Sequence, residues 1–240
     1  MAETRPYPSG VTPTFVVVVA LFITCLIAAN IIAVKLVSLF GHVLPAAIII
    51  FPMSYIIGDI LTEVYGYHRA RAVIWLGFLC NLVAVAAFWG GGLLPSAPVW
   101  EHQKAYDTIL GYTPRLLGAS FCAYLLGELT NSAVLARMKV WTRGHWLWSR
   151  TIGSTVVGQG LDSLVFISLA FVGTVPDSLL VRMVLTQWTA KVIYEAAATP
   201  LTYLVVAWLK RREGVDHYDY DTSFSPLPSI SAGPSRQKST

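Results

Sequence analysis

The sequence predicts an all-α membrane protein, a bundle of six transmembrane helices. Hydrophobic residues make up 55% of the 240 residues and charged residues only 12%, and the mean hydropathy is +0.60. Several apolar runs approach the roughly 20 residues that a helix needs to cross a bilayer. These runs are continuous, whereas the strands of membrane barrels alternate apolar and polar residues. Helices are therefore expected, because they satisfy their own backbone hydrogen bonds in lipid.

The apolar runs define one transmembrane domain over residues 14–209. The segment before it, residues 1–13, lacks the charged start and cleavage site of a signal peptide, so we expect the first span to be retained. The long last span is expected to tilt, or to break near Pro200. Residues 210–240 form a cytoplasmic tail, and its Ser- and Pro-rich part, residues 223–240, is expected to be disordered. The six spans are 14–36, 43–62, 70–89, 116–136, 152–175 and 179–209.

Basic residues predict how the spans are oriented. With both termini in the cytoplasm, three inner segments hold most Lys and Arg residues, as the positive-inside rule requires. Tryptophans lie near span ends, where aromatic belts form, except Trp188, which is placed deep. The net charge of +4 comes from scattered loop residues and gives little support to nucleic-acid binding. The inner basic residues are Arg69, Arg71, Arg137, Lys139, Arg143, Arg150, Lys210, Arg211 and Arg212.

Motifs of enzymes and metal sites do not occur in the sequence. There is no HExxH, no GxSxG and no Walker-type loop, and residues 90–92 are three glycines that suit a loop at a helix end. Cys25, Cys80 and Cys122 lie inside expected spans without metal-ligand spacing, so we expect small packing residues and no disulfide. The sequence therefore predicts no enzyme, no metal and no cofactor.

Two carboxylates stand near the end of the second expected span, in the stretch GDILTEVYGYH. Asp59 and Glu63 lie four residues apart and are followed by Arg69 and Arg71. Because this span runs inward, both acids are expected near the cytoplasmic side. We expect them to pair with basic residues there and, with Tyr65, to serve folding or gating without contacting a ligand.

A second set of polar residues lies near the middle of the expected spans. Counting about 1.5 Å per residue from each span end places the set in the middle third of the bilayer. Residues three or four apart share a helix face, so each helix offers one polar face. Charged groups at this depth cost several kcal/mol unless paired, and they usually face a cavity, a partner or a transport path. The set comprises Asn81, Glu128, Asn131, Gln159, Asp162, Gln187 and Lys191, with Glu195 one turn beyond.

Two interpretations of this set stay open. Lys191 could pair with Glu128 or Asp162 as glue between helices, with nothing bound. One lysine cannot satisfy all the carboxylates and amides, however, so we favour a polar binding site at the membrane midplane. Tyr124, one turn before Glu128, and Trp188 are candidate stacking platforms, although aromatic residues in membrane helices more often serve packing.

Five segments of the chain together resemble the queuosine precursor transporter family, also called the putative vitamin uptake transporter family. They are FPMSYIIGDILTEVYGYHRARAVIWLGF, GELTNS, QGLDSLVFISLAF, KVIYEAAATP and the tail DHYDYDTSFSPL. The resemblance runs from about residue 14 to residue 227, and the TEVYGY segment and the tail motif are specific to it.

The resemblance implies a multi-pass inner-membrane protein related in fold to the substrate-binding subunits of energy-coupling-factor transporters. It implies import of a queuosine precursor for tRNA modification: 7-cyano-7-deazaguanine, 7-aminomethyl-7-deazaguanine or queuine. It also implies work without a dedicated ATPase, in agreement with the missing nucleotide motifs. The matching motifs carry over Asp59, Glu63, Tyr65, Glu128, Asn131, Gln159, Asp162, Lys191 and Glu195.

The substrate that the resemblance implies fits the polar set. A deazaguanine presents N1–H and its exocyclic amine side by side to one carboxylate, and an O6 to an amide or ammonium. Glu128 is expected to bind this edge, with Asp162 as the alternative, and a cationic precursor would favour an extra carboxylate such as Glu195. The expected partners are this small molecule and the bilayer, not nucleic acid. A binding-only subunit that needs an energising module is the alternative function. The preferred precursor, the energy coupling and homodimer formation stay open.

Overall fold

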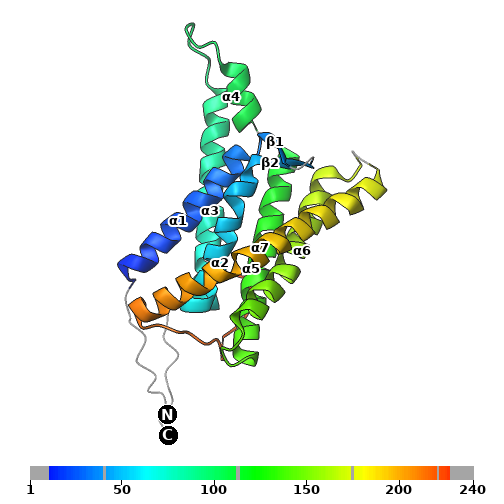
Figure 1. Cartoon of the computed structure of the whole chain (residues 1–240). Helices are drawn as coiled ribbons and strands as arrows, with labels where there is room; N and C mark the ends of the chain where they lie inside the picture. Colours follow the sequence, from blue (N-terminus) through cyan, green and yellow to red (C-terminus); the bar gives the residue numbers. More distant parts are fainter. Residues whose placement is uncertain (1–10, 40–41, 112–113, 174–175, 221, 228–240) are drawn as a thin grey trace.

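Long α-helices dominate the computed structural model, which describes residues 11–39, 42–111, 114–173, 176–220 and 222–227 (Figure 1). Most of the expected N-terminal segment 1–13, and the tail beyond residue 227, lie outside the described residues. The elements are α1 (Pro13–Ile32), β1 (Leu36–Leu39), β2 (His42–Pro45), the 3₁₀ helix η1 (Ala46–Ile49), α2 (Phe51–Tyr65), α3 (Tyr67–Leu93), α4 (Gln103–Leu110), α5 (Pro114–Trp141), α6 (Leu147–Phe171) and α7 (Asp177–Glu213).

The first two expected spans are wrong at their facing ends. α1 ends at Ile32, and β1 and β2 form an antiparallel hairpin that includes residues 36 and 43–45, which the prediction gave to helices. α2 begins only at Phe51, with Pro52 in its first turn. Proline is favoured at this position because the first backbone N–H groups of a helix have no partner inside it. The apolar composition of the hairpin concealed this break.

The end of α3 also differs from the expectation. Residues 90–92 are helical, and α4, which the sequence did not predict, folds back against them. The Tyr106 hydroxyl of α4 donates to the Phe88 carbonyl at 2.8 Å. A Cβ atom at Gly91 would lie 2.6 Å from that hydroxyl oxygen, so glycine here allows the close approach of α4. Gly91 and Gly92 therefore form a contact surface for α4 within the helix.

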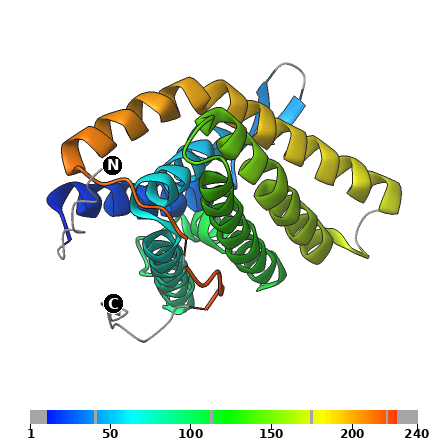
Figure 2. The ribbon, with the colours of Figure 1, turned by 90° about the horizontal axis from the view of Figure 1, so that it is seen from below.

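α5 and α6 lie side by side and approach closely through two glycines (Figure 2). A Cβ atom at Gly127 would lie 2.6 Å from the Asp162 Cβ, and one at Gly158 would lie 2.5 Å from the Asn131 Cβ. α7 has 37 residues and continues through Pro200, so the break expected there does not occur. It runs diagonally across the other helices in Figure 1, as expected for a tilted helix. Small residues thus set how closely these polar helices pack.

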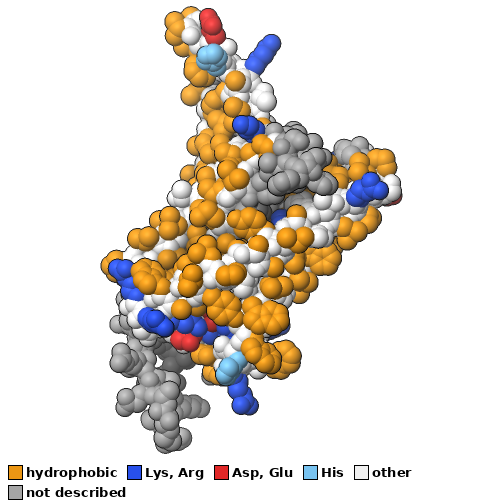
Figure 3. Space-filling view, in the orientation of Figure 1, with side chains coloured by type: hydrophobic (Ala, Val, Ile, Leu, Met, Phe, Trp, Pro, Cys, Tyr) orange, Lys and Arg blue, Asp and Glu red, His pale blue; other side chains and the backbone are white. Residues whose placement is uncertain are grey.

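Four described helices, α1, α3, α6 and α7, are long and apolar enough to cross a membrane. α2 has 15 residues and spans about 22 Å, less than the roughly 30 Å hydrocarbon core. α5 has 28 residues but carries several charged groups. Large apolar side chains are exposed along the span helices, among them Val17, Leu79, Leu164 and Leu204. Figure 3 shows such side chains over the middle of the molecule and basic groups gathered near the C-terminal end of α7.

α2 is the central helix, and it packs against α1, α3, α5 and α7 (Figure 2). Its residues from Ser54 to Tyr65 are buried except Ile57, which is partly buried. A helix covered by protein on several sides does not need an apolar surface toward lipid, which explains how α2 accommodates two carboxylates. Apolar residues of α2 join neighbouring helices in one core: Phe22, Ile56, Ile60, Leu61, Val64, Tyr65, Ala70, Val73, Leu147, Val206 and Leu209.

Candidate functional site

A buried polar cluster joins α2, α5, α6 and α7. Its carboxylates are shielded from solvent, with Asp59 1%, Glu128 2% and Glu195 2% exposed. We define the polar cluster as Tyr55, Asp59, Glu128, Asn131, Gln159, Asp162, Lys191 and Glu195. Six of these eight residues come from the set expected at the membrane midplane or one turn beyond it. Tyr55 and Asp59 were not expected in that set.

Asp59 lies in this cluster and not at the basic end of the bundle. The Asn131 side-chain amide donates to Asp59 Oδ1 at 2.6 Å. The Asp59 charge also interacts with those of Glu195 and Glu128. The expected partners lie elsewhere, because Arg71 donates to the Ser225 carbonyl and Arg69 stacks over the Phe15 ring. The expectation that Asp59 lies with the basic residues at the end of the bundle is therefore wrong.

Lys191 forms an ion pair with Asp162, which confirms that it is charge-balanced inside the bundle. The Lys191 ammonium also lies 5.6 Å from the centre of the Tyr55 ring. The Gln159 side chain forms a hydrogen bond with Tyr55. Tyr55 therefore connects α2 to the polar groups of α6 and α7. It stands four residues before Asp59 on the same helix face, a spacing that could have identified it from the sequence.

Glu128 lies against α2 at a glycine. A Cβ atom at Gly58 would come within 2.6 Å of Glu128 Oε1. Next to this contact, the Thr62 hydroxyl donates to the Gly58 carbonyl and to Ser132 Oγ, both at 3.0 Å. α2 and α5 are therefore joined by polar contacts over two turns, and Gly58 leaves the space that the Glu128 carboxylate occupies.

For three of the other expected site residues, the hydrogen-bond partners lie outside the polar cluster. Asn81 accepts a hydrogen bond from Asn30 of α1 at 3.0 Å, a partner that the sequence analysis missed. The Tyr124 hydroxyl donates to the Ile74 carbonyl at 3.0 Å. Trp188 donates to the Val156 carbonyl at 2.9 Å and lies over Gly160 of α6. Tyr124 and Trp188 thus both tie one helix to another. Gln187 of α7 is partly buried.

Several buried oxygen atoms of the polar cluster have no hydrogen-bond partner within the described part of the chain. All of them can accept a hydrogen bond when the carboxylates are ionised. An unpaired buried acceptor costs about 1–3 kcal/mol, so an excess of acceptors favours a ligand that brings donors. The atoms are Asp59 Oδ2, Glu128 Oε2, Asn131 Oδ1, Gln159 Oε1 and Glu195 Oε1.

A second charged cluster surrounds Glu63. Its carboxylate oxygen Oε1 contacts Arg150 at 2.9 Å and Lys210 at 2.8 Å, and Lys139 lies 3.6 Å away. Glu63 and Arg150 are both 1% exposed. The expectation that Glu63 pairs with basic residues is confirmed, although the partners come from α5, α6 and α7 and not from the residues next in sequence. Tyr65 is buried in the apolar core, with its ring edge against Phe15.

The C-terminal segment, residues 215–220 and 222–227, binds to this end of the bundle. Asp216 contacts Lys139 at 2.6 Å and Lys210 at 2.9 Å. The Asp219 carboxylate accepts from the Tyr67 backbone N–H at 3.0 Å. Gly66 has φ +82°, and a Cβ atom there would lie 2.2 Å from the His217 ring, so glycine suits both the turn and the docking. The segment therefore covers the α2–α3 turn.

The prediction that residues 223–240 are disordered is wrong for residues 223–227. The Ser225 carbonyl accepts from Arg71 at 2.6 Å, and the Pro226 carbonyl accepts from the Trp75 indole at 2.9 Å. The Phe224 ring lies 4.6 Å below the Arg137 guanidinium. Backbone carbonyls and one aromatic ring therefore fix this Ser- and Pro-rich stretch, features that composition does not reveal.

The family of the chain follows from its sequence profile. The profile described as putative vitamin uptake transporter matches residues 45–205, about two thirds of the chain. The chain belongs to this family. The match contains α2, α3, α5 and α6 and most of α7, and hence every residue of the polar cluster.

The chain is similar to a protein of Bacillus subtilis (strain 168) named "Probable queuosine precursor transporter". It is 28% identical over 178 residues, which cover 74% of this chain and 78% of the relative. The "Queuosine precursor transporter" of Escherichia coli (strain K12) is 27% identical over 125 residues, 50% of this chain and 52% of the relative. No solved structure matches the chain, so the likeness to energy-coupling-factor subunits stays a prediction.

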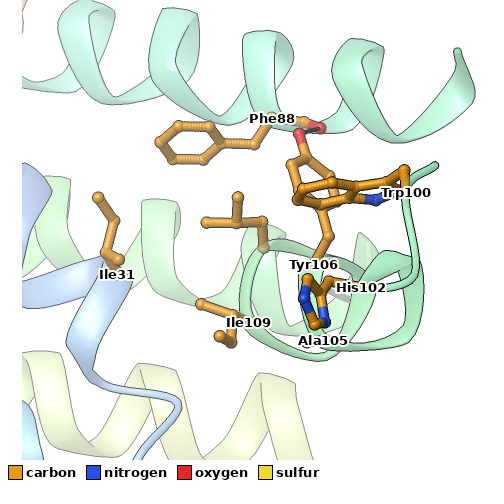
Figure 4. A pocket seen from close by; sticks show the side chains of 8 residues that line it. Ile31, Phe88, Trp100, His102, Ala105, Tyr106 and Ile109 are labelled. Carbon is orange, nitrogen blue, oxygen red and sulfur yellow. Dashed lines mark hydrogen bonds between the residues drawn. The ribbon is translucent and has the colours of Figure 1, made fainter. Parts of the chain in front are cut away.

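An apolar pocket of 460 Å³ lies between α3, α4 and the end of α1, and none of its lining residues belongs to the polar cluster (Figure 4). The Tyr106 hydroxyl reaches the Phe88 backbone carbonyl, and the Phe88 ring points away from Tyr106. The pocket has no carboxylate among its lining residues, so it is unsuited to a polar heterocycle with several N–H donors. Its lining residues are Ile31, Phe88, Trp100, His102, Ala105, Tyr106, Ile109 and Leu110.

Proposed function

We propose that the protein imports a 7-deazaguanine precursor of queuosine across the inner membrane. Two relatives that align with at least half of the chain are named as queuosine precursor transporters. The observation that carries the proposal is the excess of buried acceptor oxygens in the polar cluster. A deazaguanine brings donors that complement them: N1–H, the exocyclic amine and the pyrrole N–H.

Glu128 is our choice for the carboxylate that binds the guanine edge. Its Oε2 has no hydrogen-bond partner among the described residues, and Gly58 gives the side chain room. The alternative, Asp162, is already held by the Lys191 ammonium. A carboxylate engaged by a cation is less able to take two further N–H donors. The Gln159 amide and the Lys191 ammonium stand on the facing helices and could donate to the substrate O6.

In this proposal six helices cross the membrane: α1, α3, α6 and α7, together with α2 and α5, which the other helices shield. The hairpin and η1 add to the length of α2 on the outer side. The polar cluster is closed to solvent, so import requires the helices to open alternately toward the two sides. The basic end of the bundle, with Glu63 and the C-terminal segment, would face the cytoplasm.

The test is uptake of labelled precursors by cells that lack both synthesis and salvage of these compounds. We expect uptake when this chain is the only added protein, and a loss of at least about 100-fold with Glu128→Gln, because the substituted amide points a donor at the ligand N–H. Glu101→Gln changes an exposed carboxylate outside the cluster and serves as the control.

Protein amount in the membrane and thermal unfolding check that Glu128→Gln folds. Near-parental uptake by Glu128→Gln, together with loss of uptake in Asp162→Asn, would move the guanine-binding role to Asp162. Ligand-dependent stabilisation without uptake would favour the binding-only subunit. No stabilisation by any deazapurine would contradict the proposed substrate class.

A further inference from the structure

The carboxylates of the polar cluster outnumber its cations. Asp59, Glu128, Asp162 and Glu195 share the cluster with one lysine, and Lys191 pairs with Asp162. The other three carboxylates form no ion pair with any described residue. All three are at most 2% exposed. Several uncompensated charges cannot remain together in such an interior, because each costs several kcal/mol.

Glu128 has a role in the proposed function, so Asp59 and Glu195 are left without one. They extend from the contacting helices α2 and α7, and among the nearby charges Glu195 acts most strongly on Asp59. Asp59 Oδ2 and Glu195 Oε1 have no hydrogen-bond partner among the described residues, and neither does Asn131 Oδ1. Asn131 is neutral, and its amide already holds Asp59 Oδ1. This group of acceptors therefore lacks a hydrogen donor.

We infer that Asp59 and Glu195 together form a binding site for one transported proton, and that import of the substrate is coupled to proton entry. This inference rests on the proposed function. Two buried carboxylates whose charges interact do not both ionise readily, and a proton on one of them removes a charge and supplies the missing donor. The carboxylates take the proton from external water and release it to cytoplasmic water, so one proton enters with each substrate.

The other titratable groups around the pair are consistent with this assignment. Lys191 on the same helix is the nearby cation, and it is engaged by Asp162. Arg71 on α3 is held by the C-terminal segment. Glu63, one turn from Asp59, is surrounded by three cations of its own. The remaining groups near the carboxylates of the polar cluster are Tyr55 on α2 and Tyr124 and Glu128 on α5.

A proton fits the site better than a metal cation. Among the described residues, no group of three or more His, Cys, Asp or Glu side chains is arranged to hold a metal ion. Sodium or calcium requires about six oxygen ligands, whereas a proton requires one donor and one acceptor oxygen. Asp59 lies one turn from Glu63 and hence near the cations that contact Glu63. These positive charges favour the ionised form of Asp59 when the site is open to the cytoplasmic side, where the proton is released.

The experiment uses the purified full chain in liposomes that contain a pH-sensitive dye, with 7-cyano-7-deazaguanine as the probe. With no gradient imposed, addition of the probe outside should acidify the interior in proportion to uptake. A gradient of two pH units, acid outside, can sustain up to about 100-fold accumulation for one proton per substrate. In wild-type protein, uptake with the gradient should be several-fold higher than uptake without it. Asp59→Asn and Glu195→Gln should each reduce this ratio to about one. Glu101→Gln should keep the wild-type ratio.

Wild-type protein alone can overturn the inference. Probe exchange across the membrane without acidification and without a response to the gradient would refute proton coupling but leave the proposed function intact. A response to a sodium gradient only would replace the proton by sodium. Absence of both exchange and probe-induced stabilisation would instead contradict the proposed function.

Discussion

Glu63→Gln should destabilise the protein strongly, because Glu63 is the acid on which three cations converge. Arg150 and Lys210 contact one of its oxygens at 2.9 and 2.8 Å, and Lys139 lies 3.6 Å away. The substitution keeps the volume but removes the charge. Arg150, which is 1% exposed, then stays buried without its carboxylate. The loss is therefore dominated by an uncompensated buried cation.

The magnitude follows from the geometry. At an effective dielectric constant of about 20, two unit charges 3 Å apart attract by about 6 kcal/mol. Part of this gain is offset by desolvation in the native protein, and removal of one partner of a buried pair costs about 3–5 kcal/mol. Asp216 contacts the same two lysines, but its side chain is 41% exposed. Asp216→Asn should therefore cost at most about 1 kcal/mol.

Thermal unfolding in detergent separates these two acids. With the scaling of soluble domains of 150–250 residues, Glu63→Gln should lower Tm by about 6–20 °C and Asp216→Asn by less than about 4 °C. The double variant Glu63→Gln with Arg150→Met should recover part of the loss, because it removes the unpaired cation. Equal melting of the two single variants would refute the view that burial of the charges sets the cost.

Two further outcomes are expected. Burial opposes ionisation of Asp216, but Lys139 and Lys210 outweigh this effect and hold the pKa of Asp216 below its usual range. The stabilising effect of the ionised carboxylate is therefore present above about pH 4 and is lost as the pH falls through the lowered pKa. The difference in Tm between wild type and Asp216→Asn should shrink in acid, and a constant difference down to pH 3 would contradict this. A reporter that works only in the cytoplasm should be active when it is fused after Leu209. Activity there of a reporter that works only outside the cell would reverse the proposed orientation.

The sequence predicted the existence of the long helices well but not the depth of their residues. The expected second span began at residue 43, which placed Asp59 near its inner end. α2 begins at Phe51, so Asp59 is the ninth of its 15 residues. The error came from the β1–β2 hairpin, whose apolar residues resemble a helical span. A register error of this kind moves a side chain by more than one helical turn, enough to assign it to the wrong cluster.

The choice of site residues depended on a different kind of information. Mid-span carboxylates and amides are rare enough to be identified from the sequence, which explains why Glu128, Asn131, Gln159 and Asp162 were found. Contacts that depend on the lack of a side chain at a glycine were not predictable. Gly58, Gly127 and Gly158 give no hydropathy signal, although they determine where Glu128, Asp162 and Asn131 can lie.

The stretch of α2 from Gly58 to Gly66 explains why a central helix of this kind is not a uniformly apolar span. Gly58 makes room for Glu128, and Asp59 binds Asn131. One turn later, Thr62 binds Ser132, and Glu63 binds Arg150 and Lys210. Gly66 then reverses the chain and makes room for His217. Polar cluster, charged cluster and C-terminal segment are thus tied to nine consecutive residues of one helix and its turn. Because Asn131 and Ser132 are neighbours on α5, substitutions of Asp59 and Thr62 should not be additive in stability.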